Sequence, residues 1–553
     1  PVDDRGRHTD YAGKYAGMTT DESNPVILAD MKESGALFAS EDITHSYPHC
    51  WRCKHPIIFR ATPQWFCSVD AFKDAAVAAT ENVRWIPGWG RERMISMIQE
   101  RSDWCISRQR RWGLPIPVFY CEDCGKSVCD DATIGAVSGL FAAEGSNAWY
   151  EKDASDILPA GYKCPHCGGT HFTKEEDTLD GWFDSGSTHF ASMQKDQGFW
   201  PATVYMEGLD QYRGWFQSSL LTAVGALGQG APFQECVTHG WTVDGEGKAM
   251  HKSLGNGVDP ADIFKKFGAD MIRLWAGSAD YHADVRCSDN IFKQLSQSYL
   301  KFRNTARYCL GNLDGFNAND LVKPQEMLEL DRWAVTRLNA LIQRCEAAYQ
   351  NYEFHVVSHA VNDFCVVELS SFYLDIIKDR LYCEETDGLP RRSAQTALWL
   401  ILDTMTRIFA PILAFTCDEI WQAMPHCDGD DPRNVLLNEM NRPFTEYALD
   451  EDVMAVWEEL VKVRDAVNGA LEAARNEKKI GKSLEARVKL TVPQELANQK
   501  FMDADELADL LIVSQVRVST GTEINVDVEP AQGAKCERCW KILPSVGKDG
   551  EHP

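Results

Sequence analysis

The stretch Thr238–Asn256, THGWTVDGEGKAMHKSLGN, lies between two segments with different hydrophobic patterns. The apolar run PFQECVTHG is typical of a buried strand, and PADIFKKFGADMIRLWAG, which follows the stretch, has the spacing of an amphipathic helix. Glycines make the connecting loop flexible, and Lys248 and Lys252 stand beside His251 and Ser253. Such a loop can close on a polyphosphate and neutralise the charge that develops when a phosphoanhydride breaks. A solvated surface loop is the alternative.

Composition limits the class of protein. A chain of 553 residues predicts three or four domains at about 150 residues each, and 44% hydrophobic residues suffice for large cores. No apolar run reaches the roughly 18 residues of a membrane span, and no signal peptide is visible. The net charge of −26 argues against nonspecific coating of nucleic acid. Two basic runs, Ser107–Trp112 and Arg475–Lys482, are candidates for local RNA contacts or solvated faces.

Eight of the 19 cysteines form four CxxC pairs, which favours zinc in a reducing compartment over disulfides. Two pairs within one segment, Cys121/Cys124 and Cys164/Cys167, predict a closed structural site with four thiolates, for which Cys129 is a possible competitor. Two other pairs are half sites without a visible partner: Cys50/Cys53, for which ordinary buried thiols are the alternative, and Cys536/Cys539. The chain starts at Pro1 without methionine and ends just after the last pair, so we expect a fragment.

A second candidate site follows the predicted strand PATVYMEG, before the helical pattern DQYRGWFQSSLLTAVGAL. Glu207, Asp210 and Gln211 stand at the carboxyl end of this strand, where open α/β sheets bind ligands. An acidic cap of the helix by Asp210 is the alternative. Upstream, IIFRATPQWF predicts a strand, and the run Asp184–Ser187 after Trp182 predicts a turn at a pocket rim.

The second half of the sequence predicts two further structural parts. From about Ser296 the amphipathic segments are long and poor in glycine, which indicates a helical bundle. After one more helix within 451–482, the alternating segments ARVKLTV and VRVSTGTEINVDVE predict strands of a small α+β module.

These segments together resemble class I aminoacyl-tRNA synthetases of the bacterial isoleucyl type. The loop AMHKSLGN is similar to the KMSKS signature, with Ala249 at the first lysine and His251 at the first serine, while Lys252 is retained and Lys248 is a possible substitute. The family's HIGH motif and the catalytic centre of its editing domain are absent from this sequence. The resemblance is carried along the chain by HSYPHCWRCKHPIIFRATPQWF, WCISRQRRWGLPIPV, DTLDGWFDSGSTH, YMEGLDQYRGWFQSSL, FGADMIRLW, FRNTARY and CERCW.

The resemblance implies a fold and a division into domains. The fold is a Rossmann-like α/β catalytic half with a zinc-ribbon insertion, an α-helical anticodon-binding bundle and a small α+β C-terminal module. The expected boundaries are 1–45 for the tail of the editing insertion, 46–295 for the catalytic half with its ribbon at about 118–176, 296–450 for the bundle, and 451–553 for a tRNA-binding module with a truncated zinc knuckle.

The resemblance also implies a reaction, in which isoleucine and ATP form isoleucyl-adenylate and the acyl group then moves to tRNA(Ile). Lys252, with Lys248, His251 and Ser253 in the same loop, would act on the ATP phosphates, and Mg²⁺ would accompany ATP. The residues implied to bind amino acid or adenylate are Glu207, Gly208, Asp210, Gln211, Trp182 and His239. We expect a cytoplasmic monomer with no membrane partner, and a fragment inactive on its own. A valyl-tRNA synthetase and a noncatalytic tRNA- or zinc-binding fragment are the alternatives.

Overall fold

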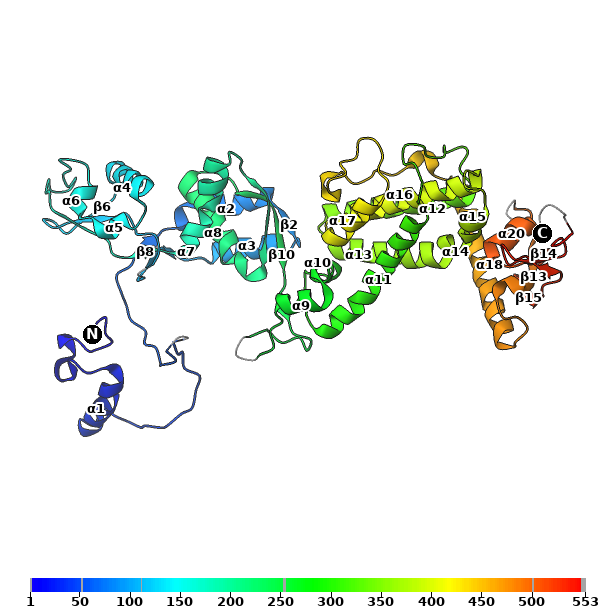
Figure 1. The fold of residues 1–553 in the computed structure, drawn as a ribbon. Coiled ribbons are helices and arrows are strands. Elements are labelled where there is room, and N and C mark those ends of the chain that lie inside the picture. The colour runs from blue at the N-terminus through cyan, green and yellow to red at the C-terminus, as the bar shows by residue number, and fades with distance from the viewer. Residues whose placement is uncertain (1, 51–52, 111, 252–254, 500–501, 549–553) are drawn as a thin grey trace. The chain divides into compact units, whose positions relative to one another are not determined.

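The computed structural model describes residues 2–50, 53–110, 112–251, 255–499 and 502–548. The chain divides into two compact units, Pro1–Thr238 and His239–Pro553 (Figure 1). None of the helices in the described residues combines the length and the apolar character needed to cross a membrane.

The first unit is built on a three-stranded sheet in the order β2-β10-β9. β2 (Arg84–Ile86) runs parallel to β10 (Phe233–His239), with Trp85 opposite Cys236, and β9 (Ala202–Gly208) is the other neighbour of β10. Three consecutive residues of β10, Cys236–Thr238, are buried, as expected where a central strand is covered on both faces. The predicted strands PATVYMEG and PFQECVTHG are therefore confirmed. The helices beside the sheet are α2 (Lys73–Ala79), α3 (Gly90–Gln99) and α8 (Trp215–Leu221).

The predicted turn at Asp184–Ser187 is wrong, because α7 (Gly181–Gly186) continues through most of it. The Asp180 carboxylate accepts a hydrogen bond from the Trp182 backbone N–H and so caps the start of this helix. α7 packs closely on α8, since a Cβ at Gly186 would lie 2.8 Å from the backbone of Ser218. The residues Asp184–Ser187 favour a turn, but the Asp180 cap and the packing of α7 on α8 stabilise a helix there instead.

The ribbon insertion has its own small sheet and core. β5 (Phe119–Cys121) pairs antiparallel with β6 (Ser127–Val128) and with β7 (Phe172–Lys174). The rings of Phe119 and Trp149 are both buried, with centroids 5.2 Å apart. The helices between the two CxxC pairs are α4 (Asp131–Glu144), α5 (Ala148–Glu151) and α6 (Ala154–Ile157).

The strand predicted for IIFRATPQWF is largely wrong. Only its last residue belongs to β1 (Phe66–Cys67), which pairs antiparallel with β3 (Trp104–Cys105), and most of the segment is exposed. Next along the chain, β4 (Ser107–Arg108) pairs with β8 (Thr178–Leu179). The N-terminal residues form η1 (Asp10–Tyr15) and α1 (Thr20–Glu33).

The second unit begins with a short pair of strands and two helices. β11 (Thr242–Val243) pairs with β12 (Val285–Arg286). The single helix expected for PADIFKKFGADMIRLWAG is instead two, α9 (Pro260–Phe267) and α10 (Ala269–Ser278). Gly268 separates them at φ +89°, a left-handed conformation that ends a helix and favours glycine.

A helical bundle and a C-terminal module complete the second unit. The bundle contains α11 (Asp289–Gly311), α12 (Glu329–Gln350), α13 (Phe354–Asp363), α16 (Leu389–Phe409) and α17 (Ala414–Ala423). After α18 (Glu451–Asn476), β13 (Ala486–Pro493) runs parallel to β14 (Gln515–Gly521) and antiparallel to β15 (Asn525–Pro530). The predicted fold class, with a helical region followed by an α+β module, is confirmed.

One buried carboxylate connects α12 to three other helices of the bundle, η8 (Phe364–Tyr373), α15 (Lys378–Cys383) and α16. Asp331 is fully buried. Its carboxylate accepts hydrogen bonds from Nη1 and Nη2 of Arg380, each at 2.9 Å, from the Tyr373 hydroxyl at 2.7 Å and from the Ser393 hydroxyl. Bidentate pairing with further hydrogen bonds is what allows a charge to be buried. Removal of the carboxylate leaves the Arg380 cation without a counter-charge.

We therefore predict that Asp331→Ala lowers the free energy of opening of α12 and α16 by about 3–5 kcal/mol, the usual cost of breaking a buried pair. Amide hydrogen exchange of peptides from both helices measures this energy locally. Asp320→Ala is the matched control, because Asp320 is exposed in its pair with Arg392 and should contribute less than about 1 kcal/mol. Equal protection in the two variants would contradict the assigned role of Asp331.

Candidate functional site

The end of β9 and the start of α8 place four of the predicted ligand-binding residues in succession. Glu207 and Gly208 end the strand, and Asp210 and Gln211 lie in the short helix η5 (Leu209–Tyr212). The Gln211 amide oxygen accepts the Trp215 backbone N–H at 2.9 Å, and the amide nitrogen donates to Asp210 at 2.9 Å. Gln211 thus satisfies the start of α8. The alternative in which the Asp210 side chain caps this helix is wrong.

Trp182 lies beside these residues. A Cβ at Gly214 would meet both the Gln211 side chain, at 2.5 Å, and the Trp182 ring, at 3.1 Å. Glycine is required at this point because the backbone, the amide and the indole approach one another so closely. The Trp182 side chain is nevertheless 45% exposed, so one ring surface is open to a ligand.

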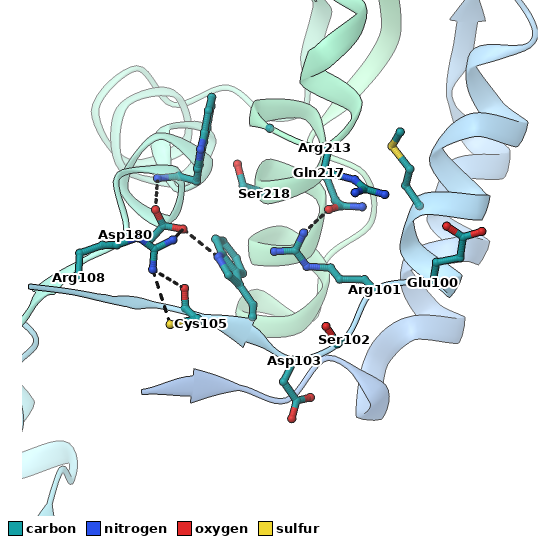
Figure 2. A pocket seen from close by; sticks show the side chains of 14 residues that line it. Glu100, Arg101, Ser102, Asp103, Cys105, Arg108, Asp180, Arg213, Gln217 and Ser218 are labelled. Carbon is teal, nitrogen blue, oxygen red and sulfur yellow. Dashed lines mark hydrogen bonds and ion pairs between the residues drawn. The ribbon is translucent and has the colours of Figure 1, made fainter. Parts of the chain in front are cut away.

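A cavity of about 380 Å³ opens next to Trp182 (Figure 2). Its walls come from the end of α3, from β3 and β4, from the start of α7 and from the start of α8. Asp180, buried in one wall, accepts the Trp104 indole N–H at 3.0 Å and pairs with Arg108 at 3.1 Å. The residues around the cavity that sequence reasoning missed are Arg101, Asp180, Arg213 and Gln217. Of these four residues, only Gln217 could have been noticed in the sequence, because its polar amide stands within the run WFQSSLL, which is otherwise typical of a buried helix.

His239 is the last residue of β10 and lies just beyond the division between the two units. Its Nδ1 lies 2.8 Å from the Gly240 carbonyl oxygen. The preceding Thr238 exchanges a hydrogen bond with the Tyr212 hydroxyl at 2.8 Å, which links the end of this strand to η5 within the first unit.

The lysine loop is described up to His251 and again from Gly255, so Lys252 and Ser253 lie outside the described residues. Asn256 holds the base of the loop: its amide nitrogen donates to Asp244 at 2.9 Å, and its oxygen accepts the His251 backbone N–H at 2.9 Å. The Asn256 amide and the Lys248 backbone N–H lower the pKa of Asp244. The Lys248 ammonium is exposed and pairs with Glu246 at 2.8 Å. The possible substitution of Lys248 for the missing lysine stays a prediction.

The four thiols of the two ribbon knuckles converge. Cys121, Cys124, Cys164 and Cys167 place their Sγ atoms within 4.8 Å of one another, as no other group of three or more His, Cys, Asp or Glu in the described residues does. The Cys121–Cys167 and Cys124–Cys164 sulfur pairs are 3.5 and 3.8 Å apart. Sulfurs at 2.3 Å from a tetrahedral zinc ion are separated by about 3.8 Å. Cys129 is not part of this cluster.

The ribbon thiols do not ionise equally. Burial opposes ionisation of Cys164, but the backbone N–H groups of His166 and Cys167 and the neighbouring thiols outweigh it and lower its pKa to about 7. The Gly169 N–H favours the Cys167 thiolate, yet burial and the other three thiols raise its pKa to about 12. Four thiolates this close repel one another, so a divalent cation is what permits full ionisation.

All four CxxC pairs share one backbone turn. In each, the first cysteine N–H donates to the carbonyl oxygen five residues on, and its own carbonyl accepts the N–H four residues on, at 2.8–3.0 Å. The fourth residue after the first cysteine is left-handed: Lys54 (φ +62°), Gly125 (φ +70°), Gly168 (φ +81°) and Trp540 (φ +66°). The half sites Cys50/Cys53 and Cys536/Cys539 thus have knuckle geometry without a third ligand in the described part of the chain.

The basic run Arg475–Lys482 is partly neutralised by its neighbours. Arg475 pairs with Glu472 at 2.6 Å and Lys479 with Glu477 at 2.8 Å. The RNA contact predicted for this run stays a prediction. In the other run, Ser107 is buried and Arg108 is paired with Asp180, whereas Gln109, Arg110 and Trp112 are exposed.

The chain thus combines an α/β sheet, with acidic and amide groups at the carboxyl end of a strand where such sheets bind ligands, with a helical bundle later in the sequence. Residues 6–288 match the family model of class I tRNA synthetases (I, L, M and V), and residues 331–490 match the anticodon-binding domain of tRNA ligases. The chain therefore belongs to the class I tRNA synthetase family.

Among curated relatives, the isoleucine–tRNA ligase of Moorella thermoacetica is 48% identical over 100% of this chain and 61% of that protein. The isoleucine–tRNA ligase of Carboxydothermus hydrogenoformans is 49% identical over the same shares. The chain thus spans about 60% of the length of the curated relatives it matches. The structure of Mycobacterium tuberculosis methionyl-tRNA synthetase bound by methionyl-adenylate aligns with TM-score 0.49 and 15% identity over 72% of this chain and 68% of that chain.

We predict that Gly125→Ala and Gly168→Ala each weaken binding of Zn²⁺ to the ribbon about tenfold. A Cβ in the left-handed conformation costs about 1–2 kcal/mol, which the knuckle must supply in order to hold both of its thiols in place. Competition with a chromophoric chelator measures the affinity. Gly135→Ala is the control, because Gly135 lies in α4 with open space around it. Unchanged affinity in both knuckle variants would show that the turn is not needed for binding.

Proposed function

We propose that this chain is part of an isoleucine–tRNA ligase, which activates isoleucine with ATP and Mg²⁺ and transfers the acyl group to tRNA(Ile). The observation that carries the proposal is the 48–49% identity to isoleucine–tRNA ligases along the whole chain. The geometry at the end of β9 agrees with this role, because acceptor groups, a close-packed glycine and an open indole surface are gathered there.

In the proposed reaction, the chain binds and positions its substrates. Glu207, Gly208, Asp210 and Gln211 would accept hydrogen bonds from, or pack against, the adenylate, and Trp182 and His239 would line the substrate pocket. The lysine loop, with Lys252, Lys248, His251 and Ser253, would stabilise the negative charge that grows on the leaving pyrophosphate. No side-chain nucleophile is needed, since orientation and charge stabilisation suffice for this chemistry.

We also propose that the ribbon holds one structural zinc ion through Cys121, Cys124, Cys164 and Cys167. Four thiols at the spacing of a tetrahedron suit zinc, which a thiolate site closes without an open coordination position. The ion would fix the ribbon and take no part in the reaction. The protein would act as a cytoplasmic monomer with tRNA(Ile), isoleucine and ATP as partners.

The proposal predicts that the full-length protein catalyses ATP–pyrophosphate exchange with isoleucine in preference to valine. Lys252→Ala should lower kcat by about two to three orders of magnitude, the scale for loss of one preorganised charge-stabilising group, with little change in KM for isoleucine. Lys248→Ala should have a smaller effect in the same direction. Lys265→Ala, on α9, is the control. A preference for valine would favour a valyl enzyme, and absence of exchange with either amino acid would favour a noncatalytic fragment.

The zinc proposal predicts about one zinc ion per purified chain, measured by metal analysis. Cys164→Ser should lose the ion, whereas Cys129→Ser should keep it. Binding should weaken steadily as the pH falls, because protons compete with the ion for the thiolates; Cys167, whose pKa is raised, is protonated before Cys164, whose pKa is lowered to about 7. A folded ribbon without metal, judged by amide exchange of β5 and β7, would refute the proposal.

A further inference from the structure

The side chain of Glu175 lies where the ribbon insertion joins the rest of the first unit. Glu175 directly follows β7, and the chain then runs through β8 to Asp180, the cap of α7. Its carboxylate oxygen Oε2 accepts hydrogen bonds from the Tyr120 hydroxyl and from the Trp65 indole N–H, the latter at 2.8 Å. The other oxygen, Oε1, accepts the backbone N–H groups of residues 176 and 177 at 2.8 and 3.0 Å.

The two side chains that donate to this carboxylate belong to different parts of the unit. Tyr120 lies in β5, next to Cys121, which is one of the four converging thiols. Trp65 lies outside the ribbon, and its backbone N–H donates to Ser107 Oγ at 2.9 Å. Ser107 is part of β4, which pairs with β8, the strand directly before Asp180. The Glu175 carboxylate therefore connects a metal-binding strand with the strand pair that leads to α7.

The protonation states of these groups favour a strong connection. Burial raises the pKa of Glu175, but hydrogen bonds from Tyr120, from the Asp177 backbone N–H and from Trp65 outweigh it and lower the pKa overall. Burial and the Glu175 carboxylate raise the pKa of Tyr120 to about 12, so the phenol remains a donor at neutral pH. Hydrogen bonds to an ionised acceptor are about twice as strong as neutral ones.

The contact between Tyr120 and Glu175 depends on the pairing of β5 with β7. Cys121 lies opposite Phe172 in this pair, so the first cysteine knuckle is attached to the strand that leads into Glu175. The hydrophobic core of the ribbon is small and centred on Phe119 and Trp149. A bound ion adds a strong link between the two knuckles, and its removal favours separation of the strands. Separation would take the Tyr120 hydroxyl away from the carboxylate.

We propose that Glu175 is a positioning residue that couples metal occupancy of the ribbon to the order of α7. With the ion bound, Tyr120 and Trp65 together fix the carboxylate, and the chain from Glu175 to Asp180 is held at both ends. Without the ion, this connecting segment gains freedom and α7 opens more often. Because α7 carries Trp182, substrate binding at the end of β9 then also depends on the metal, a consequence that rests on the proposed function.

The test on the 553-residue chain is amide hydrogen exchange of the peptide that covers residues 180–188, with zinc bound and after its removal by a chelator. In the unmodified chain, removal of zinc should accelerate exchange of this peptide about tenfold, a typical size for coupling between two sites. Tyr120→Phe deletes only the hydroxyl and should reduce this difference to less than about twofold. Glu175→Gln should do the same, because an amide cannot accept both donors at the position of Oε2.

Glu176→Gln is the matched control, because Glu176 is the exposed neighbouring carboxylate and should leave the tenfold difference unchanged. Protection of the β5 peptide in the zinc-bound variants shows that their ribbons are folded, and Glu175→Gln decides if the ribbon of Tyr120→Phe is not. The full difference in a folded Tyr120→Phe or Glu175→Gln chain would overturn the coupling. So would equal exchange of the unmodified chain with and without zinc. A chain that takes up no zinc would overturn both the zinc proposal and the coupling.

The full-length protein provides a second, reciprocal test, because coupling between two binding sites acts equally in both directions. A nonhydrolysable sulfamate analogue of isoleucyl-adenylate should raise the affinity of the ribbon for zinc about tenfold, measured by competition with a chromophoric chelator. Tyr120→Phe should abolish this increase. Equal zinc affinity with and without the bound analogue would contradict the link to the substrate site. Failure of the unmodified protein to bind the analogue would instead refute the proposed function, while the exchange test on the 553-residue chain still decides the coupling to α7.

Discussion

The buried carboxylate of Asp180 holds together the elements around the candidate site in the first unit. It joins β3 through Trp104, β4 through Arg108 and the first turn of α7 through the Trp182 backbone. These contacts set where the Trp182 indole stands and how α7 meets α8. Its pairing with Arg108 also places a neutralised arginine in the wall of the cavity beside Trp182.

The lysine loop depends on a different constraint. Asn256 binds the Asp244 carboxylate and the His251 backbone N–H, so the described residues on the two sides of the loop are held together. In the second unit, the partly buried Met250 packs against the large core, which anchors the loop from another side. A loop that closes on a ligand needs a fixed base, because its side chains must reach the same closed position each time.

The features predicted correctly from sequence are those that local chemistry determines. β9 and β10 follow from apolar runs, the C-terminal strands from alternation, and the convergence of two knuckles from cysteine spacing. The errors arise where tertiary contacts decide. α7 forms because of Asp180 and close packing on α8. Among the described residues, the segment before β1 has no neighbouring strand over most of its length. Gly268 divides a helix whose apolar spacing continues through it. The cavity beside Trp182 could not be predicted, because its lining residues come from three stretches that are far apart in the sequence, 97–108, 180–182 and 213–218.

The shared knuckle turn has a consequence for how the ribbon responds to its surroundings. Each knuckle presents two thiols from one turn, but the pairs meet only when the chain between Cys124 and Cys164 folds back. A bound ion would therefore link the two cysteine pairs, and its contribution to the stability of the ribbon would depend on the concentration of free metal. With the proposed zinc ion bound, each tenfold fall in free metal above the dissociation constant would remove about 1.4 kcal/mol from the stability of the insertion. The ribbon would lose its order through metal depletion at temperatures where the neighbouring sheet, with its aromatic core, stays folded.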